Sequence, residues 1–291
     1  MPIYVQSYRT YEGEARGRFR WVTMVRQELR VLFKVRTFVV LFVIGYLHAC
    51  FRMLQVVAYD TIVSDPNSPL YQALRQIAAL EVNERMFFDF LRIQSGLVFL
   101  TTILAGAGMI CDDVKNNLME IYFSKPLTWR DYVMGKVMTV VCVGLGFTAV
   151  PALLCLILHN ALVPSFATFT ATYWIAGSII AFSLVLVLPC ALGVLASSAL
   201  SRSDRYASIA VFMLLFGNLM LGGMLSDLLH QRNYSIVAFP LAINRVGEEL
   251  FRQRQVSFDI SWEWSGLYVL VVCVAALWII CRRVKRAEVA A

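Results

Sequence analysis

Six long runs of apolar residues constrain the fold of this chain more than any other feature of its sequence. Each run is close to 20 residues long, about the length that crosses a bilayer as an α-helix. Backbone groups inside a bilayer must be hydrogen-bonded within the protein, and the runs lack the polar–apolar alternation of barrel strands. We therefore predict an all-α membrane protein with six transmembrane helices. The expected spans are about 38–58, 93–111, 133–158, 173–200, 207–229 and 262–281.

The amino-acid composition excludes an ordinary soluble domain. The chain is 59% hydrophobic and 15% charged, whereas soluble domains average about 45–50% and about 25%. The first apolar run follows 37 largely hydrophilic residues, so we expect a retained helix rather than a cleaved signal peptide. The prediction divides the chain into a cytoplasmic N-terminus at 1–37, a six-helix transmembrane domain at 38–281 and a cytoplasmic tail at 282–291.

Lysine and arginine residues predict the orientation of the spans. With six spans, residues 1–37, 112–132, 201–206 and 282–291 lie on one side, and together with Lys136 they hold 18 of the 26 basic residues. This side is expected to face the cytoplasm, because basic loops are retained there. The net charge of +7 is then a consequence of topology, and we expect no nucleic-acid partner.

Motifs for catalysis are absent from the sequence. There is no G-x-x-x-x-G-K-[ST] phosphate loop, no H-E-x-x-H and no G-x-S-x-G, so we expect neither an enzyme nor a catalytic residue. The seven cysteines lie in or beside predicted spans without a C-x-x-C pair, which disfavours disulfides and zinc. His48, His159 and His230 have no carboxylates spaced to join them, so no metal site is expected.

Few polar residues interrupt the predicted spans. Arg52 lies near the outer end of the first span, where its long side chain is able to reach the interface. Asn218 is the one polar amide deep in a span, and it either bonds to a neighbouring helix or faces a substrate path. A proton-driven carrier normally has acidic or histidine relays inside its helices. Their scarcity here indicates that energy comes from outside the chain.

An amphipathic segment precedes the first span. Residues 18–38 place Arg26, Arg30 and Lys34 on one face beside an apolar stripe. This pattern is typical of a helix that lies in the membrane interface. A plain cytoplasmic extension of the first span is the alternative, because periodicity does not separate the two.

Two outer loops also show helical spacing. The loop at 59–92 has apolar residues at helical intervals from Leu70 to Phe90, which predicts a short external helix. The loop at 230–261 repeats the pattern at Ile243, Val246 and Leu250. It predicts an amphipathic or re-entrant helix before the last span.

One polar island separates the second and third spans. Residues 111–136 read CDDVKNNLMEIYFSKPLTWRDYVMGK and hold eight charged residues. Asp112 and Asp113 lie where a new helix would begin, and carboxylates favour that end of a helix. The spacing predicts a cytoplasmic helix of about three turns over 112–123 with one apolar face. That face consists of Val114, Leu118, Ile121 and Tyr122.

The second half of the island predicts a stop and a new start. Pro126 disfavours helix at the residue before it. Thr128 and Asp131 have the spacing of a capping box, and Gly135-Lys136 leads into the third span. A helix held between two spans would move both of them when a partner pushes on it, and such a helix suits a groove on another protein. A solvated or membrane-lying loop with no partner is the alternative, and pattern alone weighs the two evenly.

The island resembles the cytoplasmic segment of type-2 ABC transporter permeases, the membrane subunits of many bacterial exporters. The residues that match the family pattern are Asp112 or Asp113, Leu118, Glu120, Ser124, Pro126, Thr128, Arg130, Tyr132, Gly135 and Lys136. Asn117 departs from the pattern, because many members have glycine there. Met119 also departs, because it separates the usual Leu-Glu pair.

The resemblance implies a permease subunit of an ATP-driven exporter. The family has an N-terminal amphipathic helix, six spans and a broken helical hairpin before the last span. A separate ABC ATP-binding subunit would bind ATP and Mg²⁺, so we expect no cofactor on this chain. A homodimer of permeases would form a four-subunit complex with two such subunits. The expected location is the bacterial cytoplasmic (inner) membrane, with both termini in the cytoplasm and lipid around the spans.

The resemblance also implies which residues contact the ATP-binding subunit. These are Asp112, Asp113, Val114, Leu118, Glu120, Ile121, Tyr122, Pro126, Arg130, Gly135 and Lys136. Asn218 is the candidate for the substrate path. A membrane scaffold or sensor, which binds a cytoplasmic partner without transporting anything, is the competing hypothesis. No motif identifies the substrate, and the scarcity of polar residues in the spans favours a lipid-like or amphipathic molecule.

Overall fold

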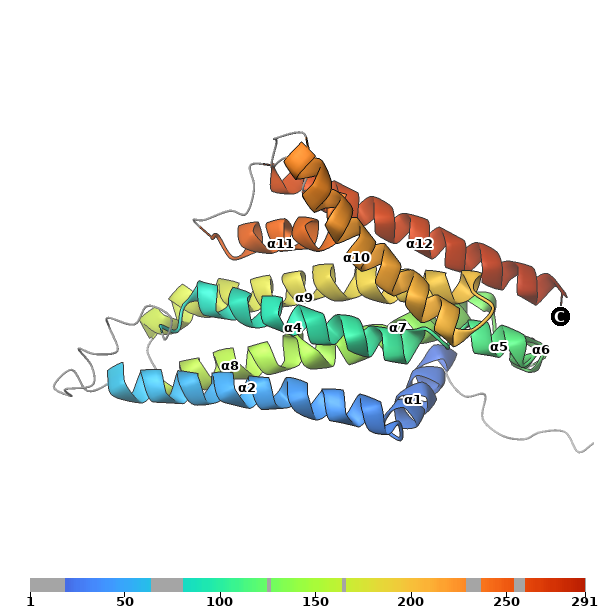
Figure 1. The fold of residues 1–291 in the computed structure, drawn as a ribbon. Helices are drawn as coiled ribbons and strands as arrows, with labels where there is room; N and C mark the ends of the chain where they lie inside the picture. Colours follow the sequence, from blue (N-terminus) through green and yellow to red (C-terminus); the bar gives the residue numbers. More distant parts are fainter. Residues whose placement is uncertain are drawn as a thin grey trace, which may run out of the picture.

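The structure is a bundle of long helices that lie side by side, with shorter helices toward its two ends (Figure 1). This computed structural model describes residues 19–63, 81–124, 127–163, 166–228, 237–253 and 260–290. These residues contain no strand, which confirms the prediction of an all-α protein.

Among the described residues, six helical stretches are long and apolar enough to cross a membrane, which agrees with the predicted number. They are formed by α2 (Arg36–Val63), α4 (Glu84–Gly106), α7 (Trp129–Phe147), α8 (Ala149–Leu162), α9 (Phe166–Leu200), α10 (Asp204–Leu228) and α12 (Trp262–Ala290). The shorter helices are α1 (Arg20–Leu32), α5 (Cys111–Lys115), α6 (Leu118–Phe123) and α11 (Phe239–Leu250). Helices α1 and α11 confirm that the two amphipathic segments are helical.

The second span begins earlier than its hydrophobicity predicts. Asn83 caps α4 by accepting a hydrogen bond from the backbone N–H of Met86, so the helix includes residues that were assigned to the outer loop. Met86 and Phe90 are buried in α4, and the prediction of a separate external helix is wrong for them. The rest of that prediction falls on residues 64–80, which lie outside the described residues.

The third predicted span, 133–158, consists of two helices. Helix α7 ends at Phe147 and α8 begins at Ala149, and Thr148 lies between them at φ −108° and ψ −76°. Pro151 has no N–H to donate to the carbonyl of Phe147, and its ring crowds that carbonyl. At the same point, the hydroxyl and the N–H of Thr148 both donate to the carbonyl of Gly144, at 3.0 and 3.1 Å. The proline therefore explains where the span breaks.

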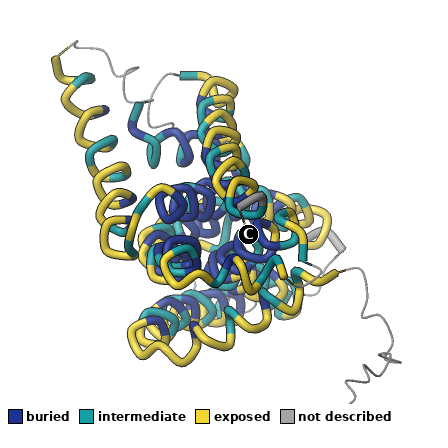
Figure 2. Tube along the Cα trace, turned by 90° about the vertical axis from the view of Figure 1, so that its right-hand side faces the viewer, coloured by how far each residue is buried: buried dark blue, intermediate teal, exposed yellow. Residues whose placement is uncertain are grey.

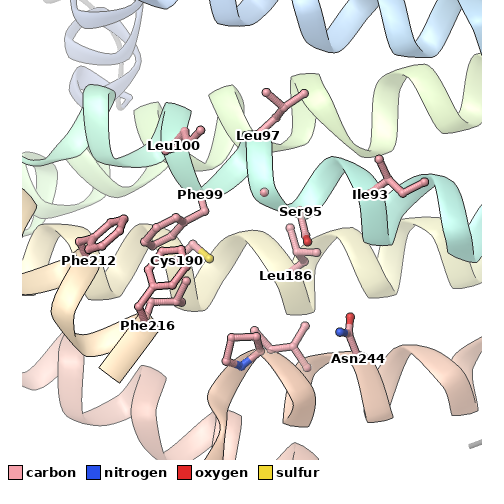
Figure 3. A pocket seen from close by; sticks show the side chains of 14 residues that line it. Ile93, Ser95, Leu97, Phe99, Leu100, Leu186, Cys190, Phe212, Phe216 and Asn244 are labelled. Carbon is pink, nitrogen blue, oxygen red and sulfur yellow. The ribbon is translucent and has the colours of Figure 1, made fainter. Parts of the chain in front are cut away.

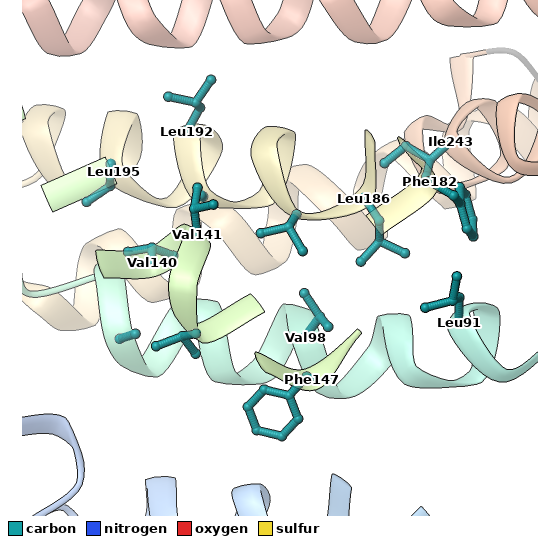
Figure 4. Close-up of a cluster of buried hydrophobic side chains, with 14 of the residues drawn as sticks. Leu91, Val98, Val140, Val141, Phe147, Phe182, Leu186, Leu192, Leu195 and Ile243 are labelled. Carbon is teal, nitrogen blue, oxygen red and sulfur yellow. The ribbon is translucent and has the colours of Figure 1, made fainter. Parts of the chain in front are cut away.

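Helices α4, α7 and α9 form the centre of the bundle. Figure 4 shows buried side chains from these three helices, among which Val98, Val140, Phe147, Phe182 and Leu195 are completely buried. Helices α2, α10 and α12 bury far less of their surface and lie on the outside, where the tube is largely yellow (Figure 2). Their exposed apolar side chains suit contact with lipid.

The close contact between α7 and α9 depends on one glycine. A Cβ atom on Gly144 would lie 2.4 Å from Cγ1 of Val187, deep inside the van der Waals contact distance. A Cβ atom on Gly146, two residues further along α7, would meet nothing within 4 Å. The two glycines therefore offer a matched test of how the central helices pack.

We expect Gly144→Ala to destabilise the chain by about 1–3 kcal/mol, because the added methyl group overpacks the contact between α7 and α9. Gly146→Ala is the control, and we expect it to be neutral or slightly stabilising because alanine is the better helix former. Thermal unfolding of both purified variants beside the parent chain measures the difference. Equal midpoints for the two variants would contradict this packing.

Candidate functional site

The polar island folds into two short helices instead of one. Helix α5 ends at Lys115 and α6 begins at Leu118, and Asn117 between them has the left-handed backbone conformation, with φ 54° and ψ 27°. The predicted continuous helix over 112–123 is therefore wrong. Asparagine is one of the few residues that enters the left-handed region at low cost. Glycine has the same freedom, so this conformation accounts for the glycine that the resemblance places at position 117.

Helix α5 is held at its start by a residue from the centre of the bundle. The hydroxyl oxygen of Ser198 on α9 accepts hydrogen bonds from the backbone N–H groups of Ile110 and Cys111, both at 3.1 Å. The first N–H groups of a helix have no partner inside that helix. Ser198 supplies one from another helix, so the start of α5 is fixed to the membrane-spanning core.

The break at Asn117 also changes which side of α6 faces the protein. Met119 is only 5% exposed, whereas Ile121 is 54% exposed. Tyr122 and Phe123 pack against the core, and burial together with the negative charge of Asp113 raises the pKa of Tyr122. The predicted apolar face of Val114, Leu118, Ile121 and Tyr122 is therefore wrong as a single face. The exposed residues around the turn at Asn117 include Asn116, Asn117, Glu120 and Ile121, here called the α6 patch, and Lys115 is exposed beside them.

The restart into the third span follows the prediction. The hydroxyl of Thr128 accepts a hydrogen bond from the N–H of Asp131, and the carboxylate of Asp131 accepts one from the N–H of Thr128, each at 3.3 Å. This confirms the capping box. The N–H of Trp129 donates to Glu288 at 3.2 Å, which ties the start of α7 to the end of α12. Arg130 is exposed, and Pro126 lies outside the described residues.

A buried charge cluster joins the island to the third span. Nζ of Lys136, on α7, lies 2.6 Å from a carboxylate oxygen of Glu28 on α1 and 2.8 Å from one of Asp113 on α5. The hydroxyl of Tyr132 donates to the same oxygen of Asp113, at 2.7 Å. Lys136 is only 2% exposed. Three helices distant in sequence are thus fixed by one ammonium group, and we call these four residues the Lys136 cluster.

The Lys136 cluster separates the predicted contact residues into two groups. Asp113 and Lys136 are buried, so their role in this structure is to position the island. Gly135 is also buried, and a Cβ atom there would lie 2.7 Å from Sδ of Met24 on α1. Asp112, Val114, Leu118 and Tyr122 are partly exposed, and Glu120, Ile121 and Arg130 are exposed.

Sequence reasoning missed Glu28. The sequence did contain a signal for it, which is its negative charge: Glu28 is the one acidic residue of α1 and lies among arginines.

A cavity of about 460 Å³ opens among α4, α9, α10 and α11 within the membrane-spanning part (Figure 3). Pockets of roughly 300–1,000 Å³ are typical of small-molecule sites. Phe99, Phe212 and Phe216 contribute aromatic rings to its wall, and Ser95 and Asn244 contribute polar side chains. The rest of the lining is almost entirely apolar.

Asn218 connects two helices beside a second, smaller cavity. Its side-chain oxygen accepts a hydrogen bond of 2.6 Å from the backbone N–H of Phe239, at the start of α11. A Cβ atom on Gly222, one turn along α10, would lie 2.6 Å from Ala238. The hydrogen bond between helices is therefore present. Asn218 also lines a cavity of about 90 Å³, and its part in a substrate path stays a prediction.

His48, His159 and Arg52 have polar partners inside the protein. His159 lies 2.8 Å from the buried carboxylate of Asp60, and His48 lies 3.0 Å from Gln94. Arg52 donates to Gln55 at 2.8 Å. Within the described ranges no group of three potential metal ligands occurs, and His230 lies outside those ranges.

Comparison with models of known protein families assigns this chain to a family. The family described as ABC-2 family transporter protein matches residues 22–262, from α1 to the start of α12. The chain belongs to the ABC-2 transporter family. A search of curated protein sequences gives no match. The family match confirms the resemblance to type-2 ABC permeases, and it identifies the chain as a multi-pass membrane component of an ABC transporter.

We expect Lys136→Met to destabilise the permease by roughly 3–5 kcal/mol, because it leaves the carboxylates of Asp113 and Glu28 close together without a cation. Lys115→Met removes an exposed lysine from the same island and is the control, with an expected change within about 0.5 kcal/mol. Thermal unfolding in detergent measures both. If Lys136→Met lowered the stability no more than Lys115→Met does, the stabilising role of the Lys136 cluster would be contradicted.

Substitutions at Asn117 test the left-handed turn in the permease. Asn117→Gly is expected to preserve stability, and Asn117→Val is expected to lower it by about 1–2 kcal/mol, because a β-branched side chain is strained at positive φ. Asn116→Val, at a neighbour with φ −95°, is the control and should change little. The turn is refuted if valine is tolerated equally at both positions in the same unfolding assay.

Proposed function

We propose that this permease is the membrane subunit of an ATP-driven exporter, and that a separate ATP-binding subunit docks on the α6 patch. The proposal rests on the way in which the α6 patch is attached to the membrane-spanning helices. Helices α5 and α6 lie between α4 and α7 in the chain, and the Lys136 cluster and Ser198 fix α5 to α7, α1 and α9. A partner that displaces α6 would therefore displace the central spans.

The α6 patch has the chemistry of a small docking surface. The large side chain of Ile121 is exposed beside the carboxylate of Glu120 and two asparagines. An apolar anchor with a polar rim is a common form for a short helix that enters a groove on another protein. The sequence has no phosphate-binding loop, so ATP and Mg²⁺ would be bound by the partner subunit.

The assembly that fits this scheme contains two copies of the permease and two ATP-binding subunits. ATP-driven closure of the two ATP-binding subunits would push both α6 patches together and reorient the spans, releasing substrate outward. The basic ends of the chain support a cytoplasmic position for both termini in a bacterial inner membrane, because basic residues concentrate on that side. The exposed surfaces of α2, α10 and α12 are available to lipid and to a second copy.

The cavity beside α10 supports an apolar or amphipathic substrate. Its aromatic and aliphatic wall offers little to replace the water around a charged molecule, and uncompensated burial of charge is costly. Ser95 and Asn244 would orient one polar group of the substrate. A molecule that already partitions into the bilayer fits this lining best.

Docking is tested by copurification of the permease with its ATP-binding subunit. We expect Ile121→Asp to weaken the complex at least about tenfold, because it replaces an apolar anchor with a charge that would have to be desolvated. Arg205→Glu, an exposed change at the start of α10, is the control and should leave binding unchanged. Retention of the partner by Ile121→Asp at parental affinity would refute docking on the α6 patch.

Transport is tested separately in vesicles that contain the complex. ATP-dependent movement of a fluorescent amphipathic probe is the expected result for the parent chain, and it should fail in the Ile121→Asp variant. If the partner binds and hydrolyses ATP while nothing moves across the membrane, the exporter proposal is refuted and the scaffold or sensor hypothesis is favoured.

A further inference from the structure

The outward face of α1 carries two arginines that the described structure leaves unpaired. Arg26 and Arg30 are exposed and lie one turn apart. Neither has a hydrogen-bond or ion-pair partner among the described residues. Glu28, the one acidic residue of α1, is turned inward to Lys136, at 2.6 Å. The exposed charge of this helix is therefore entirely positive.

Helix α1 lies crosswise at one end of the bundle, close to the start of α2 (Figure 1). Since α2 crosses the membrane, α1 runs along the membrane surface. One side of α1, with Arg20 and Gln27, faces Tyr122 across a cavity of about 420 Å³. At 100° per residue, Val22 lies on the opposite side of the helix, with Arg26 about 40° and Arg30 about 80° further around toward the wall of that cavity. Val22 and Arg26 therefore face away from the island, and Arg30 lies at the edge of that side.

Apolar side chains flank the arginine pair. Val22 is 46% exposed and Phe33, just past the end of α1, is 48% exposed. The ring of Phe33 packs edge-on against that of Phe38, with 5.3 Å between the ring centroids. This contact holds Phe33 at the point where α2 enters the membrane. Exposed apolar residues next to arginines are the arrangement with which helices bind the boundary between headgroups and acyl chains.

We propose that Arg26 and Arg30 form a binding site for the headgroup phosphate of an anionic phospholipid in the leaflet beside α1. Guanidinium groups bind phosphate oxygens through paired N–H donors, and Val22 and Phe33 would contact the glycerol and upper acyl region. A soluble acidic partner would need the arginines but would gain nothing from apolar residues at membrane level. The position of the site therefore favours lipid.

The site would connect the membrane surface to the island. Arg26, Arg30 and Glu28 belong to the same short helix, and Glu28 contacts Lys136 directly. A lipid that holds α1 against the membrane would therefore stabilise the Lys136 cluster. This consequence for the island rests on the proposed function, whereas lipid binding does not, and the test measures lipid binding alone.

The test uses the full chain, released from mixed micelles of phosphatidylcholine and increasing phosphatidylglycerol, with bound lipids counted by native mass spectrometry. Arg26→Gln/Arg30→Gln is expected to weaken phosphatidylglycerol binding about 30-fold, the change that ~1 kcal/mol per basic residue gives for two residues. Arg283→Gln/Arg286→Gln removes the same charge from an exposed pair on α12 and is expected to retain the site. Thermal unfolding in phosphatidylcholine alone verifies that both variants fold.

The outcomes distinguish a specific phosphatidylglycerol site from general electrostatic attraction of anionic lipid to the basic side of the protein. Loss of one tightly held phosphatidylglycerol in the α1 variant only, with retention in Arg26→Lys/Arg30→Lys, supports the proposal. An equal loss in the α12 control would mean that the whole basic side attracts anionic lipid, which overturns it. No loss in either variant, or equal binding of phosphatidylcholine, also overturns it.

Discussion

The burial of one ammonium group organises the end of the molecule where the chain leaves the membrane. A buried charge is costly unless it is paired, and its partners must approach within hydrogen-bond distance. Lys136 meets this requirement with carboxylates from two other helices, at 2.6 and 2.8 Å. The position of α1 and the entry into α5 both follow from that pairing, because Glu28 and Asp113 have to reach the same point beside α7.

The Lys136 cluster attaches the island to the central helices of the bundle, which are packed more tightly than the outer ones. Helices α4, α7 and α9 are packed through completely buried side chains, whereas α10 exposes most of its surface and is joined to α11 through Asn218 and Gly222. Ser198 on α9 and Lys136 on α7 attach the island to the packed centre. A displacement of α6 would move this centre relative to α10, and the cavity between them would change shape.

Local patterns in the sequence were sufficient for the spans and the capping box. Apolar length predicts a membrane-crossing helix because the bilayer imposes that length, and Thr128 and Asp131 are close enough in sequence to be recognised as a pair. The sequence did not predict the break at Asn117, because periodicity continues across it, or the burial of Lys136, because Glu28 is 108 positions away. The start of α4 at Glu84 was missed because a polar cap, not hydrophobicity, determines it.

In the proposed mechanism, force applied to α6 reaches the central spans through the Lys136 cluster. The most direct measurement is the distance between spin labels at Ile93 on α4 and Leu228 on α10, both exposed, in the complex with its ATP-binding subunit. We expect this distance to change when ATP binds to the partner, and we expect the change to be lost in the Lys136→Met variant with the partner still bound. An unchanged distance on ATP binding, or the same change without Lys136, would contradict it.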